Sequence, residues 1–171
     1  MLTVRNLTIA DHEGVRTHLA RCWRDTYTNL VGGERVEEMI ASLDAVDLGI
    51  MVPDGLALIA VETADGSQSM TPTDCIVGTA IAAERGRIGY IWGMYVSAEN
   101  KRNGIGRALI NEIQQLLPSA KQFSVVVLQA SPDARAFYEA LGFSPTAAFD
   151  YELAAGLSLP ATTMVYGGVH A

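Results

Sequence analysis

The stretch Tyr90–Leu117, YIWGMYVSAENKRNGIGRALINEIQQLL, decides the fold. Its beginning, up to Val96, is mostly aromatic or β-branched, which favours an extended strand. The polar segment Ser97–Asn103 ends this strand. From Ile105 onward the apolar residues recur at intervals of three and four, which predicts an amphipathic helix that stops at Pro118.

The junction between this strand and this helix predicts an anion site. The first N–H groups of a helix have no partner within the helix and carry a partial positive charge. Gly104 and Gly106 let a ligand approach the backbone, and Lys101, Arg102 and Arg107 add positive charge. A phosphate or pyrophosphate is the expected ligand. A tight turn with solvated basic side chains accounts for the same spacing.

Other phosphate-binding motifs fit poorly. There is no G-x-x-x-x-G-K-[ST], and Leu109 stands where G-x-G-x-x-G requires a third glycine. The order of strand, Lys101–Gly106 (KRNGIG) and helix resembles the acetyl-CoA motif [Gln/Arg]-x-x-Gly-x-[Gly/Ala] of the GNAT family of N-acetyltransferases, with lysine at its first position. A second segment, Ser131–Phe143 (SPDARAFYEALGF), is similar to that family's N-x-x-A-x-x-F-Y-x-x-x-G-F. The resemblance covers roughly Cys75–Phe143.

The composition indicates one globular domain over residues 1–171, with 49% hydrophobic residues. No apolar run reaches membrane-spanning length, and the N-terminus lacks the long apolar region of a signal peptide. The net charge of −7 argues against general nucleic-acid binding. Cys22 and Cys75 have no metal or redox spacing, so we expect reduced thiols. We expect a cytoplasmic protein without a metal, a membrane or a nucleic-acid partner.

The apolar periodicity and the chain breakers predict the element order βααβββαβαββ, a mixed α/β fold with a mostly antiparallel sheet and helices on both faces. This order is the one expected of a GNAT-like fold. The expected strands are Leu2–Ile9, Gly55–Glu62, Cys75–Glu84, Tyr90–Val96, Phe123–Gln129, about Ser144–Glu152 and about Thr162–Tyr166, the last two separated by a turn around Gly156 and Pro160. The expected helices run from a cap at Asp11 to about Tyr27, over Glu34–Leu43, from Ile105 to Leu117, and over Asp133–Leu141 after a cap at Ser131.

The resemblance implies transfer of an acetyl group from acetyl-CoA to a primary amine by direct attack on the thioester. It places the diphosphate on the glycine loop and the thioester carbonyl beside a backbone N–H at the end of the motif strand, where Gly93 predicts a bulge. The residues implied in binding acetyl-CoA are Met94, Tyr95, Val96, Lys101, Arg102, Asn103, Gly104, Ile105, Gly106 and Arg107, with Ser131 where the family often has an asparagine.

Tyr138 stands at the family's proton-donor position, where it would protonate the departing thiolate. A tyrosine pKa of about 10 against about 8.5 for a thiol makes this transfer mildly uphill. A hydrogen bond from the hydroxyl to sulfur is the alternative. A helix aromatic that fills the core beside Phe137 accounts for the same residue.

The general base stays unassigned. Two positions that often hold a carboxylate in the family are filled by Tyr90 and Val126. Glu84 is the best candidate, because it ends a strand expected to pair with the strand that holds Tyr90. The other candidates are Asp25, Asp150 and Glu152, and a relay of ordered waters without a protein base is equally open. His12, His18 and His170 receive no role.

The acceptor is left open among small-molecule amines, polyamines, antibiotics and protein N-termini. Trp23, Asp25 and Tyr27 are candidates for lining its pocket, although a core aromatic stripe accounts for Trp23 as well. A homodimer is compatible with the resemblance, since dimers are common among relatives. Two other functions compete: a CoA-binding regulatory module without turnover, because both usual base positions are vacant, and an acyltransferase with a different acyl donor or an O-acceptor.

Overall fold

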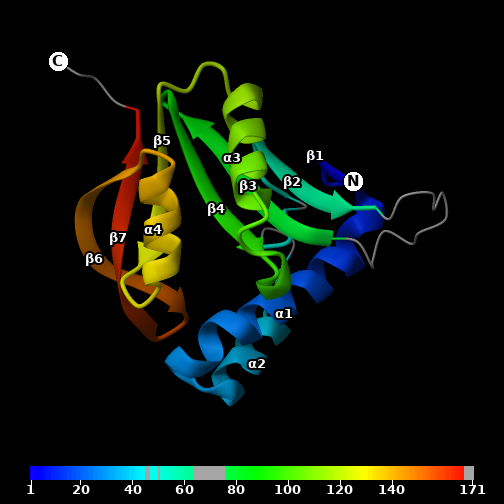
Figure 1. Cartoon of the computed structure of the whole chain (residues 1–171). Coiled ribbons are helices and arrows are strands. Elements are labelled where there is room, and N and C mark those ends of the chain that lie inside the picture. The colour runs from blue at the N-terminus through cyan, green and yellow to red at the C-terminus, as the bar shows by residue number, and fades with distance from the viewer. Residues whose placement is uncertain (45–46, 50, 64–75, 168–171) are drawn as a thin grey trace. The chain divides into compact units, whose positions relative to one another are not determined.

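In the part of the chain that the structure describes, seven strands form one sheet in the order β1-β2-β3-β4-β5-β7-β6. The computed structural model describes residues 1–44, 47–49, 51–63 and 76–167, so Cys75 and His170 lie outside the described residues. The strands are β1 (Leu2–Asn6), β2 (Gly55–Glu62), β3 (Ile76–Arg85), β4 (Ile88–Val96), β5 (Gln122–Leu128), β6 (Ser144–Ala154) and β7 (Leu157–Tyr166). The helices are α1 (His12–Val31), α2 (Gly33–Ala41), α3 (Ile105–Leu116) and α4 (Pro132–Ala140). The expected order βααβββαβαββ and the mixed α/β class are confirmed (Figure 1).

The chain forms two compact units. The first comprises Met1–Ala83 and Gly93–Leu116 and is called the α3 unit below. The second comprises Glu84–Trp92 and Leu117–Ala171 and is called the α4 unit. Within the described residues, no helix is long and apolar enough to cross a membrane.

Helices cover both faces of the strands in the α3 unit. Val15 of α1 belongs to a buried cluster with Ile59 of β2. Successive side chains of a strand point to opposite faces, so Ala60 points away from α1. On that opposite face a Cβ at Gly78 would come within 2.9 Å of Ile105 Cγ2 and 3.4 Å of Ala60 Cβ. The glycine in β3 therefore lets α3 lie close against the sheet.

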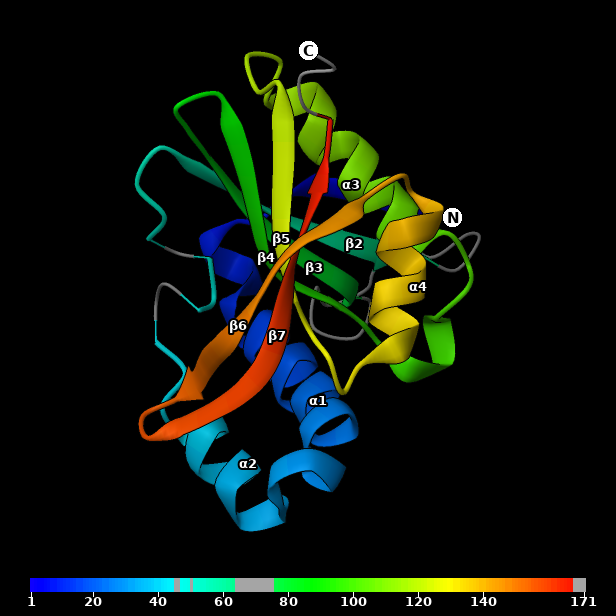
Figure 2. The ribbon, with the colours of Figure 1, turned by 90° about the vertical axis from the view of Figure 1, so that its left-hand side faces the viewer.

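In the α4 unit, β5 has a strand partner on each side, as its run of apolar residues predicts. Parallel pairs join it to β4 from Ile88↔Gln122 to Ile91↔Val125, and antiparallel pairs join it to β7. The side of the strand that carries Val126 is not fully covered, because Val126 remains 41% exposed. Figure 2 shows β6 and β7 as a long hairpin, with β6 at the edge of the sheet.

The expected turn at Pro160 is wrong. β7 begins at Leu157, and Pro160 lies within it opposite Asp150 of β6. Proline has no N–H to contribute to a ladder, which is why it indicated a break. Its carbonyl still accepts a hydrogen bond of 2.9 Å from the Gln129 amide, so the strand continues through it.

Other boundaries move less. β1 ends at Asn6 rather than Ile9, where a 3₁₀ turn begins, and α1 continues to Val31 rather than about Tyr27. The remaining described ends differ from those expected by no more than two residues, except the start of β7.

Asp11 is the N-cap residue that precedes α1, but its carboxylate makes no capping hydrogen bond to that helix. It is 1% exposed and accepts two hydrogen bonds of 2.8 Å from the Arg5 guanidinium. It also accepts a bond of 2.8 Å from the Thr8 amide. The hydrogen bonds from Arg5 lower the pKa of Asp11 well below its usual range, against the opposing effect of burial. Asp11 therefore ties β1 to the start of α1.

We expect Asp11→Asn to lower the free energy of unfolding by about 2 kcal/mol, because it removes the negative charge of the carboxylate that accepts hydrogen bonds from Arg5 and Thr8. The contribution of the carboxylate is present above its usual pKa and is lost as pH falls, so wild type and variant should converge in acid. Chemical unfolding at several pH values measures this. Glu37→Gln, which breaks an exposed ion pair with Arg24, is the control and should change the free energy by less than about 1 kcal/mol. Equal losses in both variants would contradict the assignment.

Candidate active site

The loop between β4 and α3 ends in a helix N-terminus whose amides are free. The first α-helical hydrogen bond runs from the Ala108 amide to the Gly104 carbonyl at 2.9 Å. The described residues provide no acceptor for the amides of Ile105, Gly106 and Arg107, as expected of a first helical turn. Gly104 has a φ of 79°, and nothing lies within 4 Å of the place where its Cβ would be. These amides and the open approach form a cradle for an anion.

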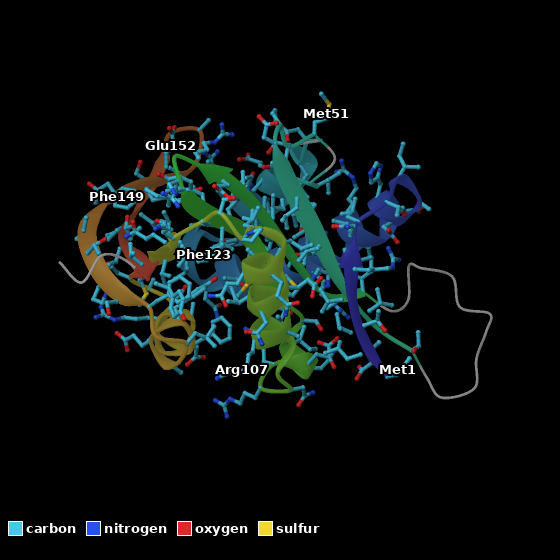
Figure 3. All side chains as sticks on the ribbon, turned by 90° about the horizontal axis from the view of Figure 1, so that it is seen from above. Met1, Met51, Arg107, Phe123, Phe149 and Glu152 are labelled. Carbon is cyan, nitrogen blue, oxygen red and sulfur yellow. The ribbon has the colours of Figure 1, made fainter. Side chains whose placement is uncertain are left out.

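Three basic side chains surround this cradle. Lys101, Arg102 and Arg107 are exposed, and none forms an ion pair within the described part of the chain. Figure 3 shows Arg107 directed away from the ribbon. The acidic neighbour Glu99 is paired with Arg21 at 2.9 Å. The loop is therefore locally positive in a chain of net charge −7.

Buried polar contacts hold the loop in shape. Ser97 is fully buried, and its amide bonds the Val77 carbonyl at 3.1 Å. The Asn100 side-chain amide donates to the Ser97 hydroxyl at 2.9 Å. Arg102 has a φ of 69°, so the chain turns sharply just before the cradle, and Asn103 is exposed. The amides at the start of α3 are thus presented by an anchored loop.

The end of β4 is irregular at Gly93, as the sequence predicts. Gly93 has a φ of 58°, and its carbonyl accepts a hydrogen bond of 3.1 Å from the Thr79 hydroxyl. The three residues that follow, Met94, Tyr95 and Val96, are half-buried. They lie in the α3 unit, together with the cradle.

Tyr95 packs against aromatic residues of α1. The Tyr27 and Tyr95 hydroxyls are 2.8 Å apart, and the Trp23 ring meets Tyr27 and Tyr95 edge-on, with ring centroids 6.1 and 6.3 Å away. Trp23 packs against the buried core cluster of this unit, which supports its interpretation as a core aromatic. Asp25 is exposed and does not join this group.

Tyr138 lies in the α4 unit with its side chain buried. It is 5% exposed and has edge-on ring contacts with Phe137 and Phe143, at centroid distances of 5.0 and 5.2 Å. Burial raises the pKa of Tyr138 above its usual value. The hydroxyl therefore stays protonated at neutral pH and can donate a hydrogen bond.

Three of the carboxylates considered as bases lie on β3 and β6. Glu84 is half-buried near the end of β3, whereas Asp150 and Glu152 are exposed on β6. Tyr90 and Val126 are both 41% exposed. Tyr90 pairs with Ser124, two residues before Val126, so the two vacant base positions share one face of the α4 unit. That face carries apolar and aromatic groups where a carboxylate is usual.

Ser131 begins α4 without a side-chain capping bond, so the expected cap is made only by its carbonyl, which accepts from the Arg135 amide at 3.1 Å. Arg135 lines a hollow of about 240 Å³. The other residues that line this hollow are Val127, Leu128, Gln129, Thr162 and Met164. Sequence reasoning gave no role to Arg135, whose side chain forms an ion pair with Glu139 at 2.8 Å. It also gave none to His18, whose Nε2 lies 3.2 Å from the Tyr95 carbonyl oxygen and whose signal in the sequence is its place on the buried face of α1.

The strand order of the mixed sheet and the unbonded amides at the start of α3 agree with the fold and the anion site expected from the two motifs. The sequence profile of the acetyltransferase (GNAT) family matches residues 17–143. The chain therefore belongs to the GNAT family, and the family resemblance of its two motifs is confirmed. A search of curated proteins gave no match.

Solved structures share this fold along nearly the whole chain. PaiA N-acetyltransferase from Thermoplasma acidophilum, in complex with coenzyme A, is 17% identical with a TM-score of 0.75, and the match covers 98% of this chain and 99% of that one. A GNAT-family acetyltransferase from Staphylococcus aureus is 11% identical, with a TM-score of 0.70 and the same coverage. Arabidopsis thaliana NAA60, in complex with a bisubstrate analogue, is 18% identical, with a TM-score of 0.65 and 98% coverage of each chain.

Proposed function

We propose that this chain, as a single acetyltransferase domain, moves the acetyl group of acetyl-CoA to a primary amine by direct attack on the thioester. The observation that carries the proposal is the cradle of free amides at Ile105, Gly106 and Arg107, open at Gly104. Such a cradle fits a diphosphate, because amides and helix polarity both favour negative charge. Lys101 and Arg102 are exposed, form no ion pair with any residue that the structure describes, and add to the attraction.

The amine nitrogen forms a bond to the thioester carbon, and the bond from that carbon to sulfur breaks. Negative charge develops on the carbonyl oxygen and is stabilised by a backbone N–H among Met94, Tyr95 and Val96. The amine loses a proton to Glu84 or to ordered water, and sulfur leaves as a thiolate. The products are an N-acetylated amine and coenzyme A.

We assign Tyr138 to the departing sulfur. Because burial raises its pKa, complete proton transfer to a thiolate is more uphill than for a solvated tyrosine. A hydrogen bond that stabilises the leaving sulfur, followed by protonation from solvent, therefore suits this hydroxyl best. Ser131 occupies the position of the family's CoA-binding asparagine and is proposed to contact the cofactor.

An acceptor-dependent release of free thiol tests the proposal. Purified protein, acetyl-CoA and a panel of small amines, polyamines and peptides with free N-termini are mixed, and the coenzyme A thiol is titrated over time. Transfer to at least one amine, verified by the mass of the acetylated product, is the expected result. Acetyl-CoA binding without transfer to any amine would favour a regulatory module without turnover. That module is the main competing function, because Tyr90 and Val126 stand where the family often has a carboxylate base. Turnover only with another acyl thioester would favour a different donor.

We also propose that the protein is cytoplasmic and that it forms a homodimer. Size-exclusion chromatography with light scattering measures the oligomeric state directly.

A further inference from the structure

Asp47 is a carboxylate that the sequence did not single out, and it lines a small hollow in the α3 unit. The hollow has a volume of about 10 Å³, and Thr79 and Gly93 also line it. It is called the Gly93 hollow below. The remaining lining residues are apolar and come from α1, β2, β3 and the segments that precede β2 and α1. Of the described residues that line the hollow, Asp47 alone carries a charged side chain.

The Gly93 hollow adjoins the end of β4, where the proposed function places the thioester carbonyl. Gly93 directly precedes the three residues whose amides are considered for that carbonyl, and the Thr79 hydroxyl donates to the Gly93 carbonyl at 3.1 Å. Asp47 and Gly93 both belong to the α3 unit, whereas Glu84, the base expected from the sequence, belongs to the α4 unit. Asp47 is therefore a carboxylate that the structure brings beside the end of β4.

A tight turn holds the Asp47 carboxylate in place. Its Oδ2 accepts a hydrogen bond of 3.1 Å from the Asp44 amide, and Asp44 Oδ1 accepts one of 2.9 Å from the Asp47 amide. The next residue, Leu48, is 5% exposed and belongs to the buried cluster that contains Val15 of α1. A carboxylate has several acceptor sites, so the bond from Asp44 leaves it able to accept another proton donor.

The surroundings of Asp47 make it a stronger base than an ordinary aspartate. Partial burial raises the pKa of Asp47, and the negative charge of Asp44 acts in the same direction, against the hydrogen bond from the Asp44 amide. From α1, Arg16 reaches the neighbouring segment, where its guanidinium donates to the Leu43 carbonyl at 3.0 Å. Asp47 nevertheless remains exposed, so it can pass a proton on to solvent. These properties suit a group that accepts a proton during a reaction.

The size of the Gly93 hollow decides how such a proton can travel. A volume of about 10 Å³ has room for about one water molecule and not for an acceptor. The carboxylate of Asp47 and the hydroxyl of Thr79 are the polar side chains in its wall. A water molecule there can donate to Asp47 and accept from an N–H at the end of β4. One water molecule between the base and the reacting nitrogen is compatible with general base catalysis.

We propose that Asp47 is the general base of the transfer, which takes the proton of the attacking amine through one water molecule in the Gly93 hollow. The inference rests on the proposed function and replaces Glu84 in this role. The lone pair of the neutral amine forms the bond to the thioester carbon, which makes the N–H acidic. That proton passes to the water as the water gives one of its own to Asp47, and sulfur leaves with the electron pair of the broken bond. Asp47 then releases its proton to solvent.

Asp47→Asn tests the role of the carboxylate. Asparagine has nearly the same size and an oxygen that can accept from the Asp44 amide, but it cannot take a proton. For the best amine of the panel, we expect kcat to fall by about tenfold or more. The affinity for coenzyme A should stay within about twofold of wild type.

Asp54→Asn is the matched control. Asp54 is exposed in the turn before β2, and asparagine tolerates its φ of 53°. This variant should keep the kcat of wild type. Full turnover in Asp47→Asn, or equal losses in the two variants, would overturn the role of Asp47.

The pH profile of kcat is a readout that a merely structural role would not move. In wild type, kcat should fall as pH falls through the pKa of Asp47, and Asp47→Asn should lack this acidic limb. Asp44→Asn removes a negative charge that raises the pKa of Asp47, so its acidic limb should lie at lower pH than that of wild type. This second variant also covers the case in which Asp47→Asn does not fold. An acidic limb that persists in Asp47→Asn, or one that is unmoved in Asp44→Asn, would overturn the proposal.

A crystal structure at high resolution tests the relay itself. We expect an ordered water molecule in the Gly93 hollow within hydrogen-bond distance of the Asp47 carboxylate, and a hollow without water would overturn the relay. Wild type serves as the reference for the function. If wild type transfers acetyl to no amine, the proposed function fails; if wild type is active and Asp47→Asn matches it, only the role of Asp47 fails.

Discussion

Tyr138→Phe is expected to lower kcat about 100-fold, the smaller end of what a positioned acid contributes. The substitution keeps the ring and its contacts with Phe137 and Phe143, and removes only the hydroxyl. Without that donor, the leaving thiolate can still form, but it lacks the hydrogen bond that stabilises it. The Kd for acetyl-CoA should change by less than about twofold, because the bond is made chiefly in the transition state. Thiol release and calorimetric titration measure the two quantities.

Tyr166→Phe is the matched control. Tyr166 is also in the α4 unit, where its ring packs against Phe143 at a centroid distance of 5.5 Å, but it is 38% exposed. Loss of its hydroxyl should leave kcat unchanged. If Tyr138→Phe retains full turnover, the hydroxyl has no role in the chemistry and Tyr138 is a core aromatic. Equal losses in both variants would point to disturbed packing of the unit instead.

Gly104→Val is expected to weaken acetyl-CoA binding by at least tenfold, a loss of about 1.4 kcal/mol. The new side chain would stand in the open space beside the free amides, where the diphosphate is proposed to lie. It would also force a β-branched residue to a φ of 79°, a conformation that costs about 1–2 kcal/mol. Calorimetric titration with acetyl-CoA measures the change.

Gly86→Val separates the backbone strain from the blocked cradle. Gly86 also has a positive φ, of 58°, with nothing within 4 Å of its would-be Cβ, but it lies between β3 and β4. The control should lose similar stability and keep its affinity for acetyl-CoA. If Gly104→Val and Gly86→Val bind acetyl-CoA with equal affinity, there is no longer an argument that the amides that follow Gly104 hold the diphosphate.

Local patterns predicted the elements and the unbonded amides at the start of α3 because the physics involved is local. The spacing of apolar residues after Ile105 indicated α3, and the bounds of β2, Gly55–Glu62, are those expected. A helix N-terminus after a glycine loop has free amides whatever the rest of the fold does. The positive φ of Gly104 likewise follows from a turn that other residues adopt only with strain.

The features that were missed depend on contacts between distant residues. Nothing near His18 in the sequence indicates a bond to the carbonyl of Tyr95, because a backbone carbonyl has no sequence signature. Asp11 is the N-cap residue of α1, as expected, but the sequence did not indicate that its carboxylate pairs with Arg5, since aspartate is common at both kinds of site. The sequence allowed Tyr138 to be a core aromatic beside Phe137, but it did not indicate the contact with Phe143.

Amide chemical shifts on titration with coenzyme A test the central claim most directly. In ¹⁵N-labelled protein, the claim predicts the largest shifts at the amides of Gly104, Ile105, Gly106 and Arg107, because these donors would gain a charged acceptor. Smaller shifts should follow at Met94, Tyr95 and Val96. Saturable binding that leaves the amides at the start of α3 unmoved, or no binding at all, would contradict the claim.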